Sequence, residues 1–191
     1  MSILLEQEVK FRLPSEDEGR RILTALRVSS STGRRFEANI LYDFPDSRLT
    51  KRGEAMRLRR VDDEAWMTWK GPQHGSGRIK RRRELESPVA DADATAEIFL
   101  ALGMVESFRY EKYRSTYRLD DGIVTLDETP IGTFMEIEAS PEAITRTATT
   151  LGLDMAHAIA TSYPRLYELH RLEFPEAPPF MVFGEPTSTA P

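Results

Sequence analysis

The N-terminal segment alternates in a way that would bring acidic and basic side chains into one space. Residues 4–13 read LLEQEVKFRL. Side chains alternate between the two faces of a β-strand, so one face would carry charges only: Glu6, Glu8, Lys10 and Arg12. Two carboxylates about 7 Å apart along a strand could bind one divalent cation, because Mg²⁺ and Mn²⁺ prefer oxygen ligands. The two basic residues could contact an anion beside it. A solvated amphipathic strand would give the same pattern, so further segments are needed to decide.

Pairs of like charges two residues apart return along the chain. The acidic pairs are Glu6/Glu8, Glu84/Glu86 and Glu136/Glu138, and the basic pairs are Arg57/Arg59, Lys80/Arg82 and Lys112/Arg114. Uncompensated like charges weaken a sheet, so the repetition indicates that something lies between them. Closing the sheet into a barrel would turn these faces inward around a water-filled lumen. Carboxylates would hold one or two divalent cations, the cations would bridge phosphate oxygens, and Lys and Arg would neutralise the remaining charge.

Seven or eight strands, mostly in hairpin order, and four helices would position these side chains. The candidate strands are 4–13, 35–44, 56–61, 65–70, 78–86, 105–119, 123–128 and 133–138. The segment 105–119 could be broken near Arg109. Helices are predicted over about 15–26, 91–102, 140–151 and 155–172. Ser15 and Glu18 form a capping box, and Pro164 would interrupt the last helix. Apolar stripes on the helices would cover the outside of the barrel.

Composition limits the other possibilities. The chain has 191 residues, no cysteine and a net charge of −5, from 26 basic and 31 acidic residues. No disulfide, thiolate metal site or cysteine nucleophile is therefore expected, and the charge argues against a nucleic-acid binder. Without a signal peptide or an apolar run of spanning length, we expect a soluble cytoplasmic protein with no membrane partner. We expect one domain over residues 1–174 and a loosely ordered tail over 175–191, rich in Pro, Ser and Thr.

Several motifs resemble those of one family. Glu6-Gln7-Glu8-Val9-Lys10 fits the E-x-E-x-K signature of the CYTH superfamily, the triphosphate tunnel metalloenzymes named for class IV adenylate cyclase and thiamine triphosphatase. Further matching segments follow in the family's order: Leu41-Tyr42-Asp43-Phe44-Pro45-Asp46, Met56-Arg57-Leu58-Arg59-Arg60, Thr68-Trp69-Lys70-Gly71-Pro72, Arg82-Arg83-Glu84-Leu85-Glu86, Tyr113-Arg114, Leu126-Asp127-Glu128 and Phe134-Met135-Glu136-Ile137-Glu138. The similarity covers about residues 3–172 and is strongest to bacterial single-domain members grouped with class IV adenylate cyclases.

The resemblance implies an α+β fold, with an eight-stranded antiparallel barrel as the tunnel and amphipathic helices packed outside. It also implies Mg²⁺ or Mn²⁺, one or two ions, held by Glu6, Glu8, Glu136, Glu138 and Asp127. The implied catalytic residues are Glu84, Asp127 and Lys70. The implied triphosphate contacts are Lys10, Arg57, Arg59, Lys70, Arg82 and Arg114, to which strand alternation adds Lys80 and Lys112. Ser162-Tyr163 resembles the start of the family's C-terminal helix, which can close one mouth of the tunnel.

Three functions remain open at this point. The first is hydrolysis of a small triphosphate: tripolyphosphate, ATP or thiamine triphosphate. The second is conversion of ATP to cyclic AMP and pyrophosphate by a class IV adenylate cyclase. The third is non-catalytic binding of polyphosphate or nucleotide. We favour hydrolysis, because a cyclase also needs an adenine pocket, for which Trp66, Trp69 and Tyr42 are only candidates. The protein is expected to be a monomer or a homodimer.

Overall fold

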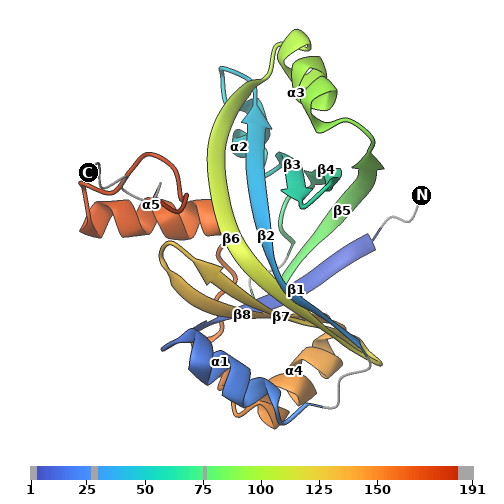
Figure 1. Ribbon diagram of the computed structural model, residues 1–191, viewed down its shortest axis with the longest axis vertical. Coiled ribbons are helices and arrows are strands. Elements are labelled where there is room, and N and C mark those ends of the chain that lie inside the picture. The colour runs from blue at the N-terminus through green and yellow to red at the C-terminus, as the bar shows by residue number, and fades with distance from the viewer. Residues whose placement is uncertain (1–3, 27–29, 75–76, 185–191) are drawn as a thin grey trace, which may run out of the picture.

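The protein is described by a computed structural model over residues 4–26, 30–74 and 77–184. Within these residues the centre is a closed antiparallel barrel of eight strands, as predicted (Figure 1). Around the barrel the order is β1, β5, β4, β3, β2, β6, β7 and β8, and β8 pairs with β1. The strands are β1 (Leu4–Leu13), β2 (Ser30–Asp43), β3 (Ala55–Val61), β4 (Glu64–Lys70), β5 (Lys80–Val89), β6 (Val105–Leu119), β7 (Gly122–Thr129) and β8 (Gly132–Ala139).

Helices cover the outer face of the barrel. They are α1 (Glu16–Leu23), α2 (Arg48–Lys51), α3 (Ala92–Ala101), α4 (Pro141–Thr150) and α5 (Tyr163–Glu173). Figure 1 shows α1 and α4 together against β7 and β8, whereas α3 lies at the opposite end of the barrel. None of the described helices is long and apolar enough to cross a bilayer.

The apolar face of the strands forms the core outside the barrel. Val9 and Phe11 of β1, Leu126 of β7 and Ile137 of β8 are buried together with Ile144 of α4. Each side chain of this size stabilises the fold by roughly 1.5–3 kcal/mol when it is fully buried. Strand alternation then turns the intervening charged residues toward the lumen. The same pattern that builds the core therefore also builds the site.

Two further clusters hold the remaining helices. Tyr42, Leu58 and Phe99 are buried between the strands and α3. A third cluster joins α5 to β6 and β8, and its buried members are Tyr110, Ile131, Phe134, Tyr163, Tyr167 and Met181. Because this last cluster includes lumen-facing positions of β6 and β8, α5 packs against one end of the barrel.

The turn after β2 is held by one carboxylate. Asp43 accepts hydrogen bonds from the backbone N–H groups of Phe44, Leu49 and Thr50, and from the Thr50 hydroxyl. These bonds satisfy the N–H groups at the start of α2, which have no partners within the helix. Asp43 is 3% exposed. The motif around Tyr42-Asp43 therefore has a structural role outside the lumen.

Strand β6 is continuous, and the predicted interruption is a local irregularity. Leu41 pairs with Phe108 and Tyr42 with Glu106, so Ser107 is an extra residue on β6. The Ser107 hydroxyl donates to the carbonyl of Leu41. A bulge of this kind bends a strand without ending it. Strand β2 also begins earlier than predicted, at Ser30.

The predicted helix over 155–172 is wrong in its first half. Met155–His157 is a single 3₁₀ turn, and Ile159 then pairs with Lys10 as an isolated bridge. Helix α5 begins only at Tyr163, with Pro164 in its first turn. Proline fits the first turn of a helix but lacks the N–H that an interior position needs, so it marks a start here.

The segment after α5, expected to be loosely ordered, packs against β6. The Met181 N–H donates to the Arg109 carbonyl, and the Met181 carbonyl accepts from the Glu111 N–H. Met181 is fully buried, and the Phe183 N–H donates to the Glu111 carboxylate. The domain boundary at residue 174 stays a prediction, and residues 185–191 lie outside the described part of the chain.

Candidate active site

The lumen encloses a cavity of about 550 Å³ lined by side chains from all eight strands and from the start of α5. Among the described residues, nine basic side chains line it: Lys10, Arg57, Arg59, Lys70, Lys80, Arg82, Lys112, Arg114 and Arg118. Seven acidic side chains line it as well: Glu6, Glu8, Glu37, Glu84, Glu86, Glu136 and Glu138. The structure thus brings all of the predicted site residues to one cavity except Asp127. Their chemical roles stay predictions.

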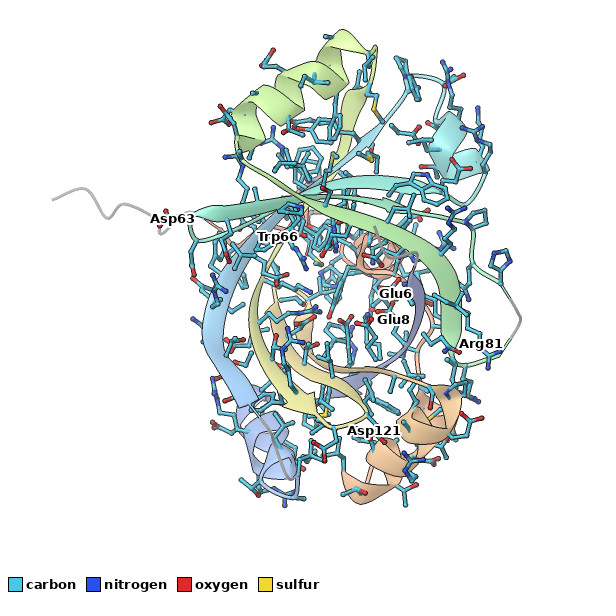
Figure 2. The ribbon with its side chains drawn as sticks, turned by 90° about the vertical axis from the view of Figure 1, so that its right-hand side faces the viewer. Glu6, Glu8, Asp63, Trp66, Arg81 and Asp121 are labelled. Carbon is cyan, nitrogen blue, oxygen red and sulfur yellow. The ribbon has the colours of Figure 1, made fainter. Side chains whose placement is uncertain are left out.

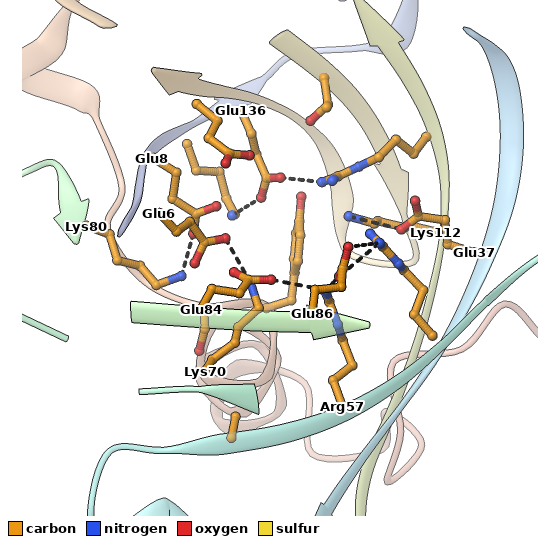
Figure 3. Close-up of a pocket in the computed structure, with 18 of the residues that line it drawn as sticks. Glu6, Glu8, Glu37, Arg57, Lys70, Lys80, Glu84, Glu86, Lys112 and Glu136 are labelled. Carbon is orange, nitrogen blue, oxygen red and sulfur yellow. Dashed lines mark hydrogen bonds and ion pairs between the residues drawn. The ribbon is translucent and has the colours of Figure 1, made fainter. Parts of the chain in front are cut away.

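One side of the cavity is rich in carboxylates. The Lys70 ammonium lies 2.8 Å from both Glu6 and Glu84, and Arg82 Nε donates to Glu6 at 3.0 Å. Lys80 pairs with Glu8 (Figure 3). These pairs join three consecutive strands of the barrel, because β5 lies between β1 and β4; Lys70 of β4 reaches across β5 to Glu6 of β1.

The pKa values on this side differ from group to group. Although burial opposes ionisation, nearby cations such as Lys70 hold the pKa of Glu6 well below its usual value. Burial, helped by the Glu6 carboxylate, raises the pKa of Glu84. Desolvation and the carboxylates of Glu6 and Glu8 raise the pKa of Glu138 to about 7. Among the described residues Glu138 forms no ion pair. The carboxylates therefore outnumber the cations locally.

The opposite side is built on a chain of alternating charges. Lys10 and Arg114 both pair with Glu136. Arg114 continues to Asp127, with Nε 2.6 Å from Oδ1. Lys112 lies 3.0 Å from Asp127 and 3.5 Å from Glu37. Although burial opposes it, these cations keep the pKa of Glu136 well below its usual range.

Asp127, a predicted metal ligand, lies beneath the wall of the cavity. It is fully buried and does not line the cavity. Its carboxylate accepts hydrogen bonds from Arg114, Lys112 and the Tyr163 hydroxyl, which lies 2.7 Å away. Asp127 lies on the same face of β7 as Thr125, which lines the cavity, but side chains from β6 and α5 cover it. It positions cations that do line the cavity.

Arg57 and Arg59 share one carboxylate. The Glu86 carboxylate accepts from Arg57 at 3.3 Å and from Arg59 at 3.1 Å. The Thr68 hydroxyl also donates to Glu86, at 2.8 Å. Tyr110 Oη lies 3.5 Å from Arg57 and faces the cavity.

The sequence analysis missed Glu37 and Tyr110, and it placed Glu86 at the lumen only as part of the Glu84/Glu86 pair, without a role. A signal for the first was present, because the apolar residues of β2 occupy even positions and leave Glu37 on the opposite face. Arg12, in contrast, was predicted to face the lumen but does not line the cavity. It was expected to continue the charged row of β1, but its guanidinium donates to the Ile131 carbonyl and lies over the Phe134 ring.

Several buried polar atoms of residues at or next to the cavity lack hydrogen-bond partners among the described residues. They are Glu37 Oε2, both side-chain polar atoms of Asn39, Nε of Arg57 and of Arg59, and Thr125 Oγ1. Buried polar groups in proteins are nearly always satisfied by protein, ordered water or ligand. Four of these residues, Glu37, Arg57, Arg59 and Thr125, line the cavity, so its wall is polar on these sides.

The comparisons with known proteins agree with this geometry. The family model described as the CYTH domain matches residues 4–163, which is more than half of the chain. The chain belongs to the CYTH domain family.

Relatives of this CYTH protein are known from archaea, bacteria and plants. A Methanocaldococcus jannaschii protein named "Putative adenylate cyclase MJ0240" is 26% identical over 140 residues, which cover 72% of this chain and 78% of that protein. A Vibrio parahaemolyticus structure described as a "putative adenylate cyclase" is 20% identical, with a TM-score of 0.75, and the match covers 87% of this chain and 99% of that one. A Hippeastrum structure described as revealing "a dominant triphosphatase activity" is 19% identical, with a TM-score of 0.63, over 91% and 98% of the two chains. The structural likeness shows the shared fold.

The carboxylates of this CYTH protein fit a divalent metal in their chemistry. All of the candidate donors are carboxylate oxygens, which suit Mg²⁺ and Mn²⁺, and like-charge repulsion around Glu138 is the kind that a bound cation relieves. No three acidic or histidine side chains of the described residues are gathered closely enough to form a ready-made metal site. Glu6, Glu8 and Glu136 are instead paired with Lys and Arg, so metal binding would require them to exchange partners.

Proposed function

We propose that this CYTH protein is a divalent-metal-dependent triphosphatase. Its substrate would be tripolyphosphate or an organic triphosphate held in the lumen. The observation that carries the proposal is the pairing of charges inside one cavity. Each of the eight predicted phosphate-binding cations contacts at least one carboxylate: Lys10, Arg57, Arg59, Lys70, Lys80, Arg82, Lys112 and Arg114.

Binding would proceed by exchange of partners. Phosphate oxygens would replace carboxylates at the arginine and lysine groups, and guanidinium groups can take them in bidentate geometry. Basic residues outnumber acidic ones at the cavity by only two, less than the charge of a triphosphate. A divalent cation entering with the substrate would balance the difference. The carboxylates released by the exchange, Glu6, Glu8 and Glu136, would hold it together with Glu138.

Catalysis would rest on position and electrostatics. When bound, the divalent cation supplies Lewis-acid polarisation of the phosphate and a lower pKa for attacking water. Lys70 lies between Glu6 and Glu84 and would stabilise the charge on the transferred phosphoryl group. Glu84, whose pKa is raised, would accept the proton of the attacking water. Asp127 would contribute through Arg114 and Lys112, which it holds in place.

A class IV adenylate cyclase is the second candidate, supported by the names of the Methanocaldococcus and Vibrio proteins. It would use the same cations and carboxylates, but the ribose 3′-hydroxyl of ATP would replace water as the nucleophile. The Hippeastrum description favours hydrolysis. Non-catalytic binding is the third candidate. It is disfavoured because anion binding alone needs no cluster of carboxylates.

The deciding experiment supplies tripolyphosphate and ATP separately, each with Mg²⁺ and with Mn²⁺. We expect metal-dependent release of phosphate from tripolyphosphate. Cyclic AMP from ATP without free phosphate would overturn this preference in favour of the cyclase. Tight binding of both compounds without turnover under either metal would support the binding module. A cytoplasmic location and the oligomeric state stay predictions.

A further inference from the structure

One tyrosine faces the cavity among charged side chains. Tyr110 of β6 lines the cavity and is 6% exposed. Side chains alternate along a strand, so Tyr110 lies on the same face of β6 as Lys112. Figure 2 shows this alternation on other strands of the barrel, with Glu6 and Glu8 in the lumen and Arg81 outside it. Tyr110 therefore places a neutral hydroxyl group in a wall that is otherwise rich in charge.

Packing and strand pairing hold Tyr110 in place. Its ring centre lies 6.1 Å from that of Tyr163 in α5 and 6.2 Å from that of Phe108. Asn39 of β2 pairs with Tyr110 along one edge of β6, and Met181 forms a bridge with it along the other edge. The hydroxyl group therefore has a fixed position before a ligand binds, which lowers the entropy that binding would cost.

The Tyr110 hydroxyl accepts one hydrogen bond and keeps its own proton to donate. Arg57 donates to it, with 3.5 Å between Nη1 and Oη. The hydroxyl makes no second hydrogen bond with the described residues. The Tyr163 hydroxyl differs, because it donates to the Asp127 carboxylate at 2.7 Å. Buried tyrosine hydroxyls usually have a partner, so the Tyr110 proton is placed to bond to an acceptor that is bound in the lumen.

The cations around Tyr110 strengthen its hydroxyl as a hydrogen-bond donor. Although burial raises it, the pKa of Tyr110 is lowered overall by Arg57, Lys112 and Lys70. These cations belong to β3, β6 and β4, and Figure 3 shows them pointing into the same lumen. A hydroxyl that already accepts a bond from a guanidinium, and lies near further cations, forms a stronger hydrogen bond to an anion.

This inference rests on the proposed function and adds a contact to the same substrate. We propose that Tyr110 is a substrate-contacting residue, whose hydroxyl donates a hydrogen bond to an oxygen of the phosphate that Arg57 binds. Each of the eight predicted phosphate-binding cations has to leave a carboxylate before it can bind phosphate. The Tyr110 hydroxyl has no carboxylate partner among the described residues. It therefore binds the substrate without an exchange of partners, and it takes no part in proton transfer.

Tyr110→Phe tests the contact, because it removes the hydroxyl and keeps the ring. Calorimetry in EDTA, where turnover is stopped, should show tripolyphosphate binding about tenfold more weakly, as expected for loss of a hydrogen bond to a charged group. With saturating metal, KM for tripolyphosphate should rise by a similar factor while kcat stays within about twofold. The Tm of the ligand-free protein should not change. Tyr117→Phe is the matched control and should bind normally, because Tyr117 lies on the same strand but packs against the core outside the barrel.

Two results with the phenylalanine variant would overturn the proposal. Unchanged affinity for tripolyphosphate would show that the hydroxyl does not contact the substrate, and a lower Tm alongside it would make the hydroxyl a structural group. A large fall in kcat with unchanged affinity would make Tyr110 a proton donor or acceptor in the reaction, which the proposal excludes.

A double variant tests whether Tyr110 and Arg57 bind the same phosphate. In the Arg57→Ala protein, the further change Tyr110→Phe should weaken tripolyphosphate binding by clearly less than tenfold, because two contacts to one group are not independent. Losses that simply multiply would contradict a shared phosphate. The binding measurements need no turnover, so the two proposals fail separately. Tripolyphosphate that binds but is not cleaved would overturn the triphosphatase alone, whereas equal binding by Tyr110→Phe would overturn the Tyr110 contact alone.

Discussion

The hydroxyl of Tyr163 donates a hydrogen bond to the Asp127 carboxylate across 2.7 Å, which joins the first turn of α5 to the charged interior of the barrel. Asp127 also accepts from Lys112 and Arg114. Helix α5 is therefore coupled to two cations that line the cavity. Ser162-Tyr163 is the segment that resembles the start of the family's C-terminal helix. In this structure its tyrosine connects that helix to the buried charges by a hydrogen bond.

Tyr163→Phe should raise KM for the triphosphate several-fold, because Lys112 and Arg114 lose one of the groups that orient their shared carboxylate. The free energy of unfolding should fall by about 1 kcal/mol, the usual value of one hydrogen bond. Tyr167→Phe is the matched control, since its hydroxyl donates to the Pro178 carbonyl away from the lumen. It should lose similar stability in urea unfolding and keep KM. An unchanged KM in both variants would contradict the coupling.

Asp127→Asn should separate a positioning role from a metal-ligand role. Removing one partner of a buried ion pair costs about 3–5 kcal/mol, because Lys112 and Arg114 would lose the carboxylate that they share and keep only Glu37 and Glu136 respectively. Bound tripolyphosphate should restore part of the lost stability, because its phosphates can pair with Lys112 and Arg114. The ligand should therefore raise the Tm of the variant more than that of the unsubstituted protein, even in EDTA. Metal affinity should change little. If the variant loses much of its metal affinity and tripolyphosphate raises its Tm no more than that of the unsubstituted protein, Asp127 is a metal ligand.

Arg57→Ala should raise KM for tripolyphosphate about tenfold or more, since a charge-assisted bond is worth about 1.5–3 kcal/mol. Arg60→Ala is the control. Arg60 lies on the same strand but pairs with Asp93 outside the lumen. Steady-state kinetics at saturating metal should show an effect only for Arg57. Equal effects would indicate a general charge effect rather than a phosphate contact.

Glu138→Gln should weaken activation by Mg²⁺ or Mn²⁺ by about tenfold or more, as expected for loss of one carboxylate donor. Because Glu138 forms no ion pair among the described residues, its loss should leave the metal-free protein folded and no less stable. Glu136→Gln is the informative contrast. It deprives Lys10 and Arg114 of a shared partner, so it should lower both metal activation and the Tm in EDTA. If Glu138→Gln keeps full metal affinity, Glu138 is not a ligand.

Asp43→Asn should lower stability near neutral pH by about 1–2 kcal/mol through weaker hydrogen bonds at the start of α2. Although burial opposes it, the bonds from Thr50, Leu49 and Phe44 lower the pKa of Asp43 below its ordinary 3.8. A carboxyl whose pKa is lower in the folded state contributes fully above pH 4, and the contribution is lost as pH falls through the folded pKa. Urea unfolding from pH 7 to pH 2 should therefore show the two proteins converging in acid. Asp46→Asn, at an exposed position in the same turn, should leave stability unchanged.

Alternation in the sequence was enough to predict the barrel and nearly all of its lumen, because the face that a side chain takes is a local property of a strand. Depth is not local. Asp127 and Glu136 both point inward, yet only the first is covered by Arg114 and Tyr163 from other elements. Pairing across distant segments was equally out of reach, as Met181 shows by bonding to the backbone of β6. The sequence of residues 175–184 has no hydrophobic periodicity from which that contact could be predicted.

The closure of the barrel affects the order in which its strands can pair during folding. Strand β1 leaves the ribosome first, yet its neighbours in the finished sheet are β5 and β8. One edge of β1 therefore waits for β5, which ends at Val89, and the other edge waits for β8, which ends at Ala139. Because pairing over such sequence separations is slow, we expect the last hairpin, β7 and β8, to set the pace of folding.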